Sequence, residues 1–494
     1  MTNSDPDLFD PETVSFPSGC LIAGELREGL GDPFPVIRPS DGKIILTMRG
    51  ADLSDVDRAV EVATQAFRSG TWRGVRPVDR ARIFRRWAYL AEQHLDELVQ
   101  LEAVASTRLA SEARVADIPK AIEIIRYYGE LMSRTHGDVL GSGGNALNFT
   151  QKEPYGVVAA ISPWNMPIIL STIKLAPALA AGNAVILKPS EFTPFSIIRL
   201  AQLAVEAGVP AACISVLPGT GPITGHALVT HPGIDYVTFT GSTQSGSVVM
   251  GDAARHGPKP VSLELGGKSP QLVFADADID IVADTVARSV IRNAGQICFA
   301  GTRLIVDQKI ANEFTDAVRR QLLTVVPGPT WKQASTLSPV ISEKQSERIL
   351  DILRQGKEAG AEITLGGGLY ENVSGGWFFK PTMVERLEQD NPIVQEEVFG
   401  PVLSVQTFSD PEEALSLAND SQYGLAAGVY SANLNTALHC AHKLQAGTVW
   451  VNQYGPDDIA SPIGGFKKSG FGKDFGADGY DKYLRLKNVR IKFG

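Results

Sequence analysis

Cysteine is scarce in this chain of 494 residues: the four present, Cys20, Cys213, Cys298 and Cys440, form no CxxC pair. The seven histidines do not cluster at the spacing of metal ligands either. A disulfide framework and a zinc site both need such patterns. We therefore expect a protein of a reducing compartment, the cytoplasm, that holds no metal.

The sequence also lacks a basic, apolar leader and any long apolar run. It begins MTNSDPDLFDPE, which is polar and acidic, and no stretch reaches the roughly 18 apolar residues of a membrane span. The formal charge of -9 disfavours nucleic acid and anionic membranes as partners. We expect a cytoplasmic protein with no nucleic-acid or membrane partner.

What is present is an ordinary globular composition, 44% apolar and 20% charged, in a chain long enough for two or three domains. Residues 52–135 show helical periodicity, with Asp52 and Asp79 placed to start helices. From Gly156 to about Gly266, short apolar runs alternate with helices that stop at Gly182, Gly208 and Gly257. This alternation predicts a doubly wound α/β domain with a parallel sheet, which binds ligands at the carboxyl ends of its strands.

The alternation restarts at QLVFADAD and continues to TVWVN, which predicts a second α/β domain containing Cys298. The tail, YLRLKNVRIKF, alternates like an edge strand and carries basic residues. Such a strand suits pairing with another subunit.

Cys298 lies in NAGQICFAGTR, between a Gly-Gln pair and an Ala-Gly pair. A lone intracellular cysteine is usually a small buried apolar residue. Here the backbone can bend and leave its N–H groups free, which favours a thiolate and an oxyanion formed beside it. Cys298 is therefore a candidate nucleophile.

Two further residues could assist that thiol. Glu264, in LELGGKSP, ends an apolar strand before two glycines and could act as a general base on water. An ion pair with Lys259 or Lys268 is the alternative. Asn165, in SPWNMP, follows the strand GVVAAIS; its amide could donate to an oxyanion, or the residue could only form a turn.

Glycine-rich loops after two strands suggest a dinucleotide. GTGPITG, from Gly219 to Gly225, is a weak signal, whereas FTGSTQSG places Ser242 or Thr243 to cap a helix that faces a pyrophosphate. In AVILKPSE, Lys188 and Glu191 could bind ribose hydroxyls. Each of these could also be an ordinary turn or a solvated charge, but together they outline a nucleotide crevice.

The whole chain resembles the aldehyde dehydrogenase superfamily, most closely its amino-aldehyde branch. The matching motifs, in the order of that family, are EPYGVVAAISPWNMP, GNAVILKPSEFTP, FTGSTQSG, LELGGKSP, NAGQICFAGTRL, QEEVFGPV and SPIGGFKKSGFG. The resemblance implies a Rossmann-type doubly wound cofactor domain (residues 1–132 and 151–263) and a second α/β catalytic domain (264–466). It also implies a small oligomerisation arm (133–150 and 467–494) that pairs subunits into a homodimer or homotetramer.

The resemblance implies that Cys298 attacks an aldehyde and that Asn165 and the Cys298 N–H hold the oxyanion. Hydride then passes to the cofactor, and Glu264 activates the water that hydrolyses the thioester. Lys174 matches a buried lysine for which a proton relay is plausible. The cofactor is NAD, with NADP possible, because Glu191 would accept a bond from a free 2′-hydroxyl and repel a 2′-phosphate. The positions that match the cofactor site are Ile161, Ser162, Pro163, Trp164, Lys188, Ser190, Glu191, Gly221, Gly225, Phe239, Thr240, Gly241, Ser242, Leu265, Gly266, Glu397 and Phe399.

The positions that match the substrate tunnel mix apolar and charged residues. They are Met166, Ile169, Leu170, Ile173, Arg292, Ile297, Phe299, Asp457, Asp458 and Ile463. Arg292 matches one half of an arginine pair that binds a distal carboxylate, with Ile173 at the other position, whereas Asp458 matches an acidic position of amino-aldehyde enzymes. We expect a polar aliphatic or amino aldehyde, unless Arg292 and the aspartates pair with each other or with solvent.

Two other functions remain open at this stage. In a CoA-acylating semialdehyde dehydrogenase, CoA takes the acyl group from the cysteine, and members of that branch commonly lack the glutamate found here at Glu264. A catalytically silent family member would bind NAD without turnover, and fold alone does not exclude it.

Overall fold

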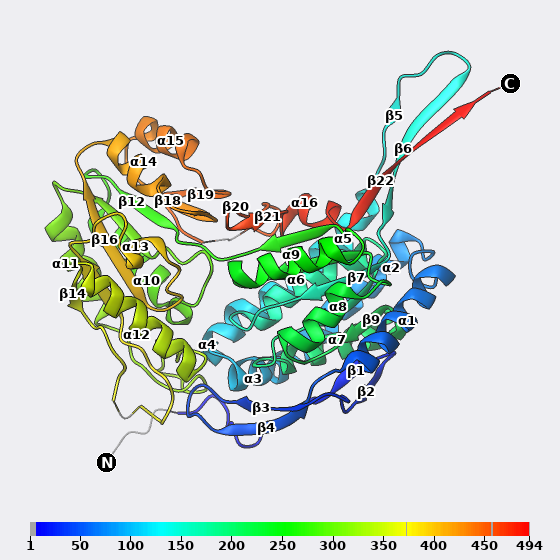
Figure 1. Cartoon of the computed structure of the whole chain (residues 1–494), viewed down its shortest axis with the longest axis horizontal. Coiled ribbons are helices and arrows are strands. Elements are labelled where there is room, and N and C mark those ends of the chain that lie inside the picture. Colours follow the sequence, from blue (N-terminus) through cyan, green and yellow to red (C-terminus); the bar gives the residue numbers. More distant parts are fainter. Residues whose placement is uncertain (1–5, 372, 456–457, 494) are drawn as a thin grey trace.

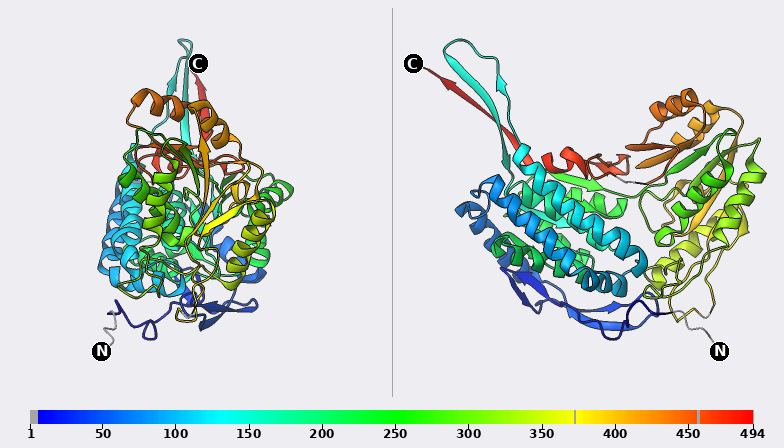
Figure 2. Two further views of the ribbon diagram at one scale, coloured as in Figure 1. Left: turned by 90° about the vertical axis from the view of Figure 1, so that its left-hand side faces the viewer. Right: turned by 180° about the vertical axis from the view of Figure 1, so that it is seen from behind.

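The computed structural model describes residues 6–371, 373–455 and 458–493. Two α/β lobes lie side by side, and a three-stranded arm projects from one of them (Figure 1; Figure 2). Within the described residues, no helix is long and apolar enough to cross a membrane. No three or more His, Cys, Asp or Glu side chains in that same part of the chain are arranged to hold a metal ion.

The first lobe is built on an eight-stranded sheet in the order β2-β1-β9-β8-β7-β10-β11-β21. Its five central strands are parallel, as the alternating sequence predicts. They are β7 (Val157–Ile161), β8 (Ala184–Lys188), β9 (Ile214–Val216), β10 (Tyr236–Thr240) and β11 (Val261–Glu264). At the edges run β1 (Cys20–Ile22), β2 (Glu25–Arg27) and β21 (Gly470–Phe471); β1 and β21 pair antiparallel with β9 and β11.

Helices cover both faces of this sheet. On one face lie α6 (Pro167–Ala180) and α7 (Phe195–Ala207), backed by α2 (Pro77–Gln93), α3 (Leu95–Ala105) and α5 (Ile118–Leu131). Against the other face pack α1 (Leu53–Ser69), α8 (His226–Thr230) and α9 (Thr243–Arg255). The short α4 (Ala110–Glu112) leads into α5, and the hairpin of β3 (Pro33–Ile37) and β4 (Ile44–Arg49) runs along the base (Figure 1).

Helix ends largely follow the sequence signals. Asp52 caps α1 in a capping box with Asp55, and Gly208 ends α7 with a φ of 115° that favours glycine. The prediction that Asp79 starts a helix is wrong. Helix α2 begins at Pro77, so Asp79 lies inside its first turn and does not cap it. Proline suits the first helical position, and Asp79 instead pairs with Arg76 and Arg82.

The second lobe has a seven-stranded sheet in the order β14-β15-β16-β13-β12-β18-β19, parallel except for β14. The strands are β12 (Pro270–Val273), β13 (Arg303–Asp307), β14 (Glu362–Leu365), β15 (Thr382–Glu385), β16 (Val402–Phe408), β18 (Ala426–Tyr430) and β19 (Thr448–Val451). The helices are α10 (Ile279–Ile291), α11 (Ala311–Leu322), α12 (Glu343–Glu358), α13 (Pro392–Gln395), α14 (Pro411–Asn419) and α15 (Leu434–Lys443). Separate apolar clusters on this sheet supply its core.

The predicted edge strand of the tail is β22 (Leu484–Lys492), which pairs along its length with β6 (Ala146–Pro154). With β5 (Val139–Leu140) these strands form the projecting arm (Figure 1). Before the arm, β20 (Phe466–Lys467) pairs with β17 (Tyr423–Gly424), and α16 (Gly476–Asp481) follows β21. The tail therefore touches both lobes before it enters the arm.

Candidate active site

The candidate catalytic residues come from three places in the chain that meet between the lobes. Asn165 follows β7, Glu264 ends β11, and Cys298 lies in the loop between α10 and β13. Strands β7, β10 and β11 are neighbours and parallel, so their carboxyl ends share one edge of the first sheet. This edge is where a doubly wound sheet binds ligands.

The loop before Cys298 has an unusual backbone. Asn293 and Ala294 both have φ of 50°, and Gly295 has φ of 71°. A Cβ on Gly295 would lie 2.1 Å from the carbonyl oxygen of Gly400, so only glycine fits there. The Gln296 side chain fixes the loop, because its amide donates to Asn293 O and Pro339 O and accepts from Ile341 N–H.

Cys298 is half-buried, unlike the other three cysteines, which are buried. Burial raises the pKa of its thiol to about 12, and the nearby carboxylates of Glu397 and Glu264 act in the same direction. Backbone N–H groups of Phe299 and Cys298 face the sulfur and oppose that shift. A base must therefore take the thiol proton before the sulfur can attack.

Asn165 is buried and held on both sides. Its Nδ2 donates to Gln296 O at 2.9 Å, and its main-chain carbonyl accepts from Asn293 Nδ2 at 2.9 Å. An amide nitrogen carries two hydrogens, so one donor of Asn165 remains for a ligand. The predicted turn and the predicted donor are thus compatible.

Glu264 forms no ion pair with Lys259 or Lys268. It is buried, its Oε1 has no hydrogen-bond partner within the described chain, and burial raises its pKa well above the usual value. The charge of Asp474 adds to this shift, and Lys482 and Lys174 oppose it. A buried carboxyl group with a raised pKa is suited to taking and giving protons near neutral pH.

Lys174 belongs to the same buried group of charges. Its Nζ donates to Thr238 Oγ1 at 3.2 Å and lies 3.9 Å from Asp474, which also pairs with Lys482. Burial lowers the pKa of Lys174 to about 8. Sequence reasoning missed Asp474 and Lys482, because only the antiparallel pairing of β21 with β11 brings the tail beside Glu264.

Cys298 and Glu264 line one cavity of about 660 Å³. Of the predicted substrate residues, Met166, Ile169, Leu170, Ile173, Arg292, Phe299 and Ile463 line it too. Ile297 and Asp458 do not line this cavity. The Asp458 carboxylate accepts from Ala460 N–H and Ser461 Oγ, so it stabilises the turn in which Asp458 itself lies. Asp457 lies outside the described residues.

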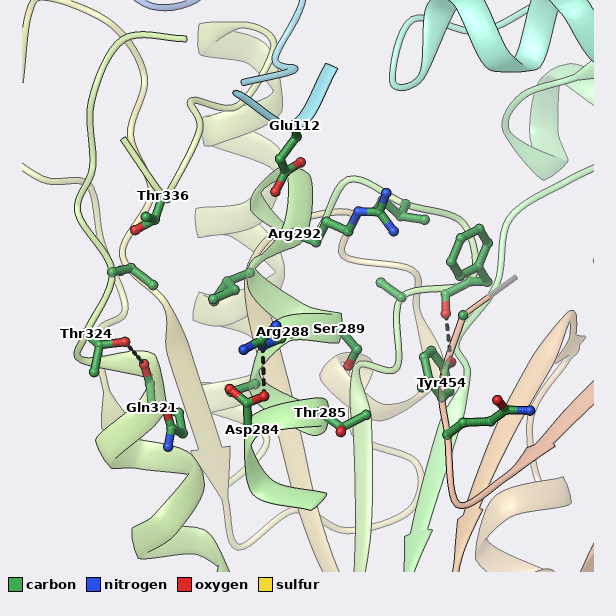
Figure 3. A pocket seen from close by; sticks show the side chains of 18 of the residues that line it. Glu112, Asp284, Thr285, Arg288, Ser289, Arg292, Gln321, Thr324, Thr336 and Tyr454 are labelled. Atoms are coloured by element: carbon green, nitrogen blue, oxygen red, sulfur yellow. Dashed lines mark hydrogen bonds and ion pairs between the residues drawn. The ribbon is translucent and has the colours of Figure 1, made fainter. Parts of the chain in front are cut away.

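A second cavity of about 880 Å³ adjoins the first, and Arg292 and Phe299 line both. Figure 3 shows Arg292 in this second cavity without any marked interaction, whereas Arg288 pairs with Asp284 at 2.8 Å. Within the part of the chain that the structure describes, no residue forms an ion pair or a hydrogen bond with the Arg292 guanidinium. Glu112, which also lines the cavity, is bound to Arg108 at 2.7 Å.

At the other side of the first sheet edge lie the predicted nucleotide residues. The register of β7 and β8 pairs Ile161 with Lys188, and Lys188 Nζ lies 3.4 Å from Glu191. Ser242 caps α9 through the N–H of Ser245, as predicted. GTGPITG forms a π-helical turn, Gly221–Gly225, that opens α8, and no atom would meet a Cβ on Gly221 within 4 Å. These features leave room for a phosphate-bearing ligand beside helix N-termini.

Glu397 and Phe399 face this edge from the second lobe. Glu397 Oε1 accepts from Gly267 N–H at 3.1 Å, and a Cβ on Gly266 would lie 2.1 Å from its Oε2. Burial raises the pKa of Glu397 to about 7. The Phe399 ring packs edge-on against Trp164 at 5.3 Å, and its φ of 55° is rare for an aromatic residue. The two glycines thus let a carboxylate of one lobe approach the strand end of the other.

The chain is similar to known proteins over nearly its full length. The model of the aldehyde dehydrogenase family matches residues 27–489. An aldehyde dehydrogenase of Emericella nidulans is 39% identical over 479 residues, covering 97% of this chain and 96% of that protein.

Solved structures are similar along the whole chain. The indole-3-acetaldehyde dehydrogenase of P. syringae, in a complex with NAD+, is 40% identical with a TM-score of 0.96 and covers 98% of each chain. The gamma-glutamyl-gamma-aminobutyraldehyde dehydrogenase of Burkholderia cenocepacia is 38% identical with a TM-score of 0.95 and again 98% of each chain. The chain belongs to the aldehyde dehydrogenase family.

Proposed function

We propose that this enzyme oxidises a polar aliphatic aldehyde to a carboxylic acid through a covalent intermediate on Cys298. The observation that carries the proposal is the 660 Å³ cavity, which a thiol and a buried carboxyl group line together. Solved structures of family members in complex with NAD+ support NAD as the cofactor.

The first step is attack of the Cys298 sulfur on the aldehyde carbon, once a base has taken the thiol proton. Glu264, whose pKa is raised, is suited to take it. The electron pair of the carbonyl bond moves to oxygen, and the free N–H of Asn165 Nδ2 and the N–H of Cys298 stabilise that oxyanion. The nicotinamide, when bound, accepts the hydride that leaves this carbon.

The remaining thioester is then hydrolysed. Glu264 first releases the proton that it took from the thiol. It then takes a proton from water, the oxygen attacks the thioester carbon, and the Cys298 sulfur leaves as thiolate with its bonding pair. The buried Lys174, whose pKa is lowered to about 8, and Asp474 could pass the proton onward from Glu264. Free acid, not acyl-CoA, is the expected product, because Glu264 lines the cavity and can activate water.

Around the cofactor, Lys188 and Glu191 would hold the adenosine ribose, and Glu397 the nicotinamide ribose, with Phe399 beside the ring. The N-terminus of α9 at Ser242 would face the pyrophosphate. Glu191 carries the preference for NAD, because its carboxylate repels a 2′-phosphate. We expect Glu191→Ser to improve kcat/KM for NADP relative to NAD by about 10-fold, and an unchanged ratio would contradict the assignment.

The substrate proposal rests on the cavity walls. Most residues near Cys298 are apolar, so an aliphatic segment fits beside the aldehyde, and a polar end would reach toward Arg292. The relative from Burkholderia cenocepacia, named for a long polar aliphatic aldehyde, supports this class. An amino aldehyde belongs to the same class and is tested in the same panel.

The decisive experiment measures NADH formation by purified protein on aliphatic, aromatic, ω-amino and ω-carboxy aldehydes, with the product identified as acid or acyl-CoA. Cys298→Ala should abolish turnover while NAD still binds. Cys440→Ala, which removes a buried thiol far from the site, is the matched control and should leave turnover intact. Acyl-CoA as the product, or bound NAD without turnover on any aldehyde, would support the two rival functions instead.

A further inference from the structure

The end of helix α3 contacts both loops that carry the proposed oxyanion donors. Thr107, two residues beyond the helix, is fully buried, and its Oγ1 donates to Asn293 Oδ1 at 2.7 Å. The side-chain amide of Asn293 then donates to the main-chain carbonyl of Asn165 at 2.9 Å and to the main-chain carbonyl of Gln296 at 3.3 Å. One neutral chain of hydrogen bonds thus joins Thr107, Asn293 and Asn165.

Asn293 is suited to this place by its backbone as well as its side chain. Its φ of 50° lies in the left-handed region, which asparagine tolerates better than other residues except glycine. Glycine would keep the backbone but lose all three side-chain hydrogen bonds. The hydroxyl of Thr107 fixes which end of the amide faces Asn165, because the Asn293 oxygen accepts from it and the nitrogen must then point the other way.

A second contact from α3 reaches the helix that begins beside Asn165. Glu102 is 1% exposed, and its Oε1 accepts from Ile168 N–H at 3.1 Å, in the first turn of α6. That helix has no side-chain cap of its own, since Met166 occupies the cap position and Pro167 has no N–H. The other oxygen of Glu102 accepts from Ser196 Oγ on α7. Glu102 therefore fixes the start of α6, two residues after Asn165.

We infer that Thr107, Asn293 and Glu102 are positioning residues, which hold the main chain at and just after Asn165 and so set the direction of its side-chain amide toward the oxyanion formed on Cys298. This inference rests on the proposed roles of Asn165 and Cys298. None of the three residues lines the cavity that holds Cys298 and Glu264. They act through Asn165, and their removal should cost activity only while Asn165 is present.

A double-mutant cycle tests that dependence. Thr107→Val keeps the shape of the side chain and removes the hydroxyl, and Thr107→Ser keeps the hydroxyl. The readout is the rate of first-turnover NADH formation, the phase in which the oxyanion forms. We expect Thr107→Val to slow it about 10-fold and Thr107→Ser to stay within about 2-fold of the wild type. In an Asn165→Ala background, Thr107→Val should change the rate by less than about 2-fold.

Asn293→Asp is the second variant, because it keeps the oxygen that accepts from Thr107 and loses the donor to Asn165. It should show the same dependence on Asn165. Losses of equal size in both backgrounds would mean that the residues only support the fold, and would overturn the inference. The alkylation rate of Cys298, measured without cofactor, should stay within about 2-fold in every variant, since alkylation forms no oxyanion.

Failure of the proposed function gives a different result. If Asn165→Ala alone left first-turnover NADH formation at the wild-type rate, Asn165 would have no role in holding the oxyanion, and the inference would fall with that role. If Asn165→Ala slowed the first turnover but Thr107→Val and Asn293→Asp did not, the proposed chemistry would stand and only the positioning roles would be wrong.

Discussion

The two halves of the candidate active site are held by different forces. On the side of Asn165 and Cys298, neutral amides, carbonyls and hydroxyls form the contacts. Asn165 Nδ2 donates to Gln296 O, the main-chain carbonyl of Asn165 accepts from Asn293, and Thr107 in turn donates to Asn293. On the side of Glu264, four ionisable groups lie together: Glu264, Lys174, Asp474 and Lys482.

The difference follows from what each side has to do. A hydrogen-bond donor acts best when it is preorganised and does not change charge, and a neutral network provides that. A general base must change its protonation state within a narrow pH range, and buried neighbouring charges set that range.

Replacing Glu264 should affect the second half of the reaction most. We expect Glu264→Gln to lower kcat about 100- to 1000-fold, because water is no longer activated. The hydride leaves before hydrolysis, so a first turnover of one NADH per Cys298 should remain, at a reduced rate because Glu264 is also the proposed acceptor of the thiol proton. The measurement is rapid-mixing NADH absorbance together with mass spectrometry of acylated Cys298. A variant that turned over normally would place the base elsewhere.

How much of the site the sequence predicts depends on where in the chain its residues lie. Cys298, Glu264 and Asn165 stand in local motifs at the ends of strands and helices, so the alternation of the chain predicts both sheets and the edge where these residues meet. The groups that adjust them come from far away in sequence. Asp474 reaches Glu264 through β21, and Thr107 reaches Asn293 across 186 positions. A short edge strand and a buried threonine carry no local signal of such a contact.

Replacing Arg292 tests whether the second cavity, which adjoins the cavity of Cys298 and Glu264, selects aldehydes by their charge. A guanidinium that has no partner among the described residues should bind a distal carboxylate and repel an ammonium. We expect Arg292→Gln to lower kcat/KM about 10-fold for an ω-carboxy aldehyde and to raise it about 2-fold for an ω-amino aldehyde. Arg288→Gln is the matched control, since Arg288 lines the same cavity but pairs with Asp284. Equal changes for charged and neutral aldehydes would assign Arg292 to support of the loop.

Replacing Asp474 tests whether the neighbouring charges set the pKa of Glu264. The negative charge of Asp474 raises the pKa of Glu264, so Asp474→Asn should lower that pKa. Because the ionised form of Glu264 acts as the base, activity is lost as the pH falls through this pKa. We therefore expect the acid limb of the kcat profile to move down by about one pH unit. Asp478→Asn, an exposed aspartate on α16, should leave the profile unchanged. An unmoved limb in Asp474→Asn would mean that another group controls it.

Glu102 is a buried carboxyl group that supports the neutral half, and its effect should appear in stability. Burial raises its pKa to about 7, with Asp117 adding to the shift and Ser196, Ile168 N–H and Arg108 opposing it. The folded protein therefore keeps a proton that the unfolded chain releases near pH 4.5. Stability from this group is full below that pH and is lost as the pH rises through about 7.

Glu102→Gln keeps an oxygen for Ile168 N–H and has no charge to bury. We expect it to be more stable than the wild type at pH 8 by about 1–3 kcal/mol, and close to it at pH 5. Thermal unfolding at both pH values measures this, with Glu206→Gln, an exposed glutamate on α7, as the control. A variant destabilised equally at both pH values would show that the Glu102 charge itself holds the start of α6. The position of Asn165 in the neutral half would then depend on the negative charge of Glu102.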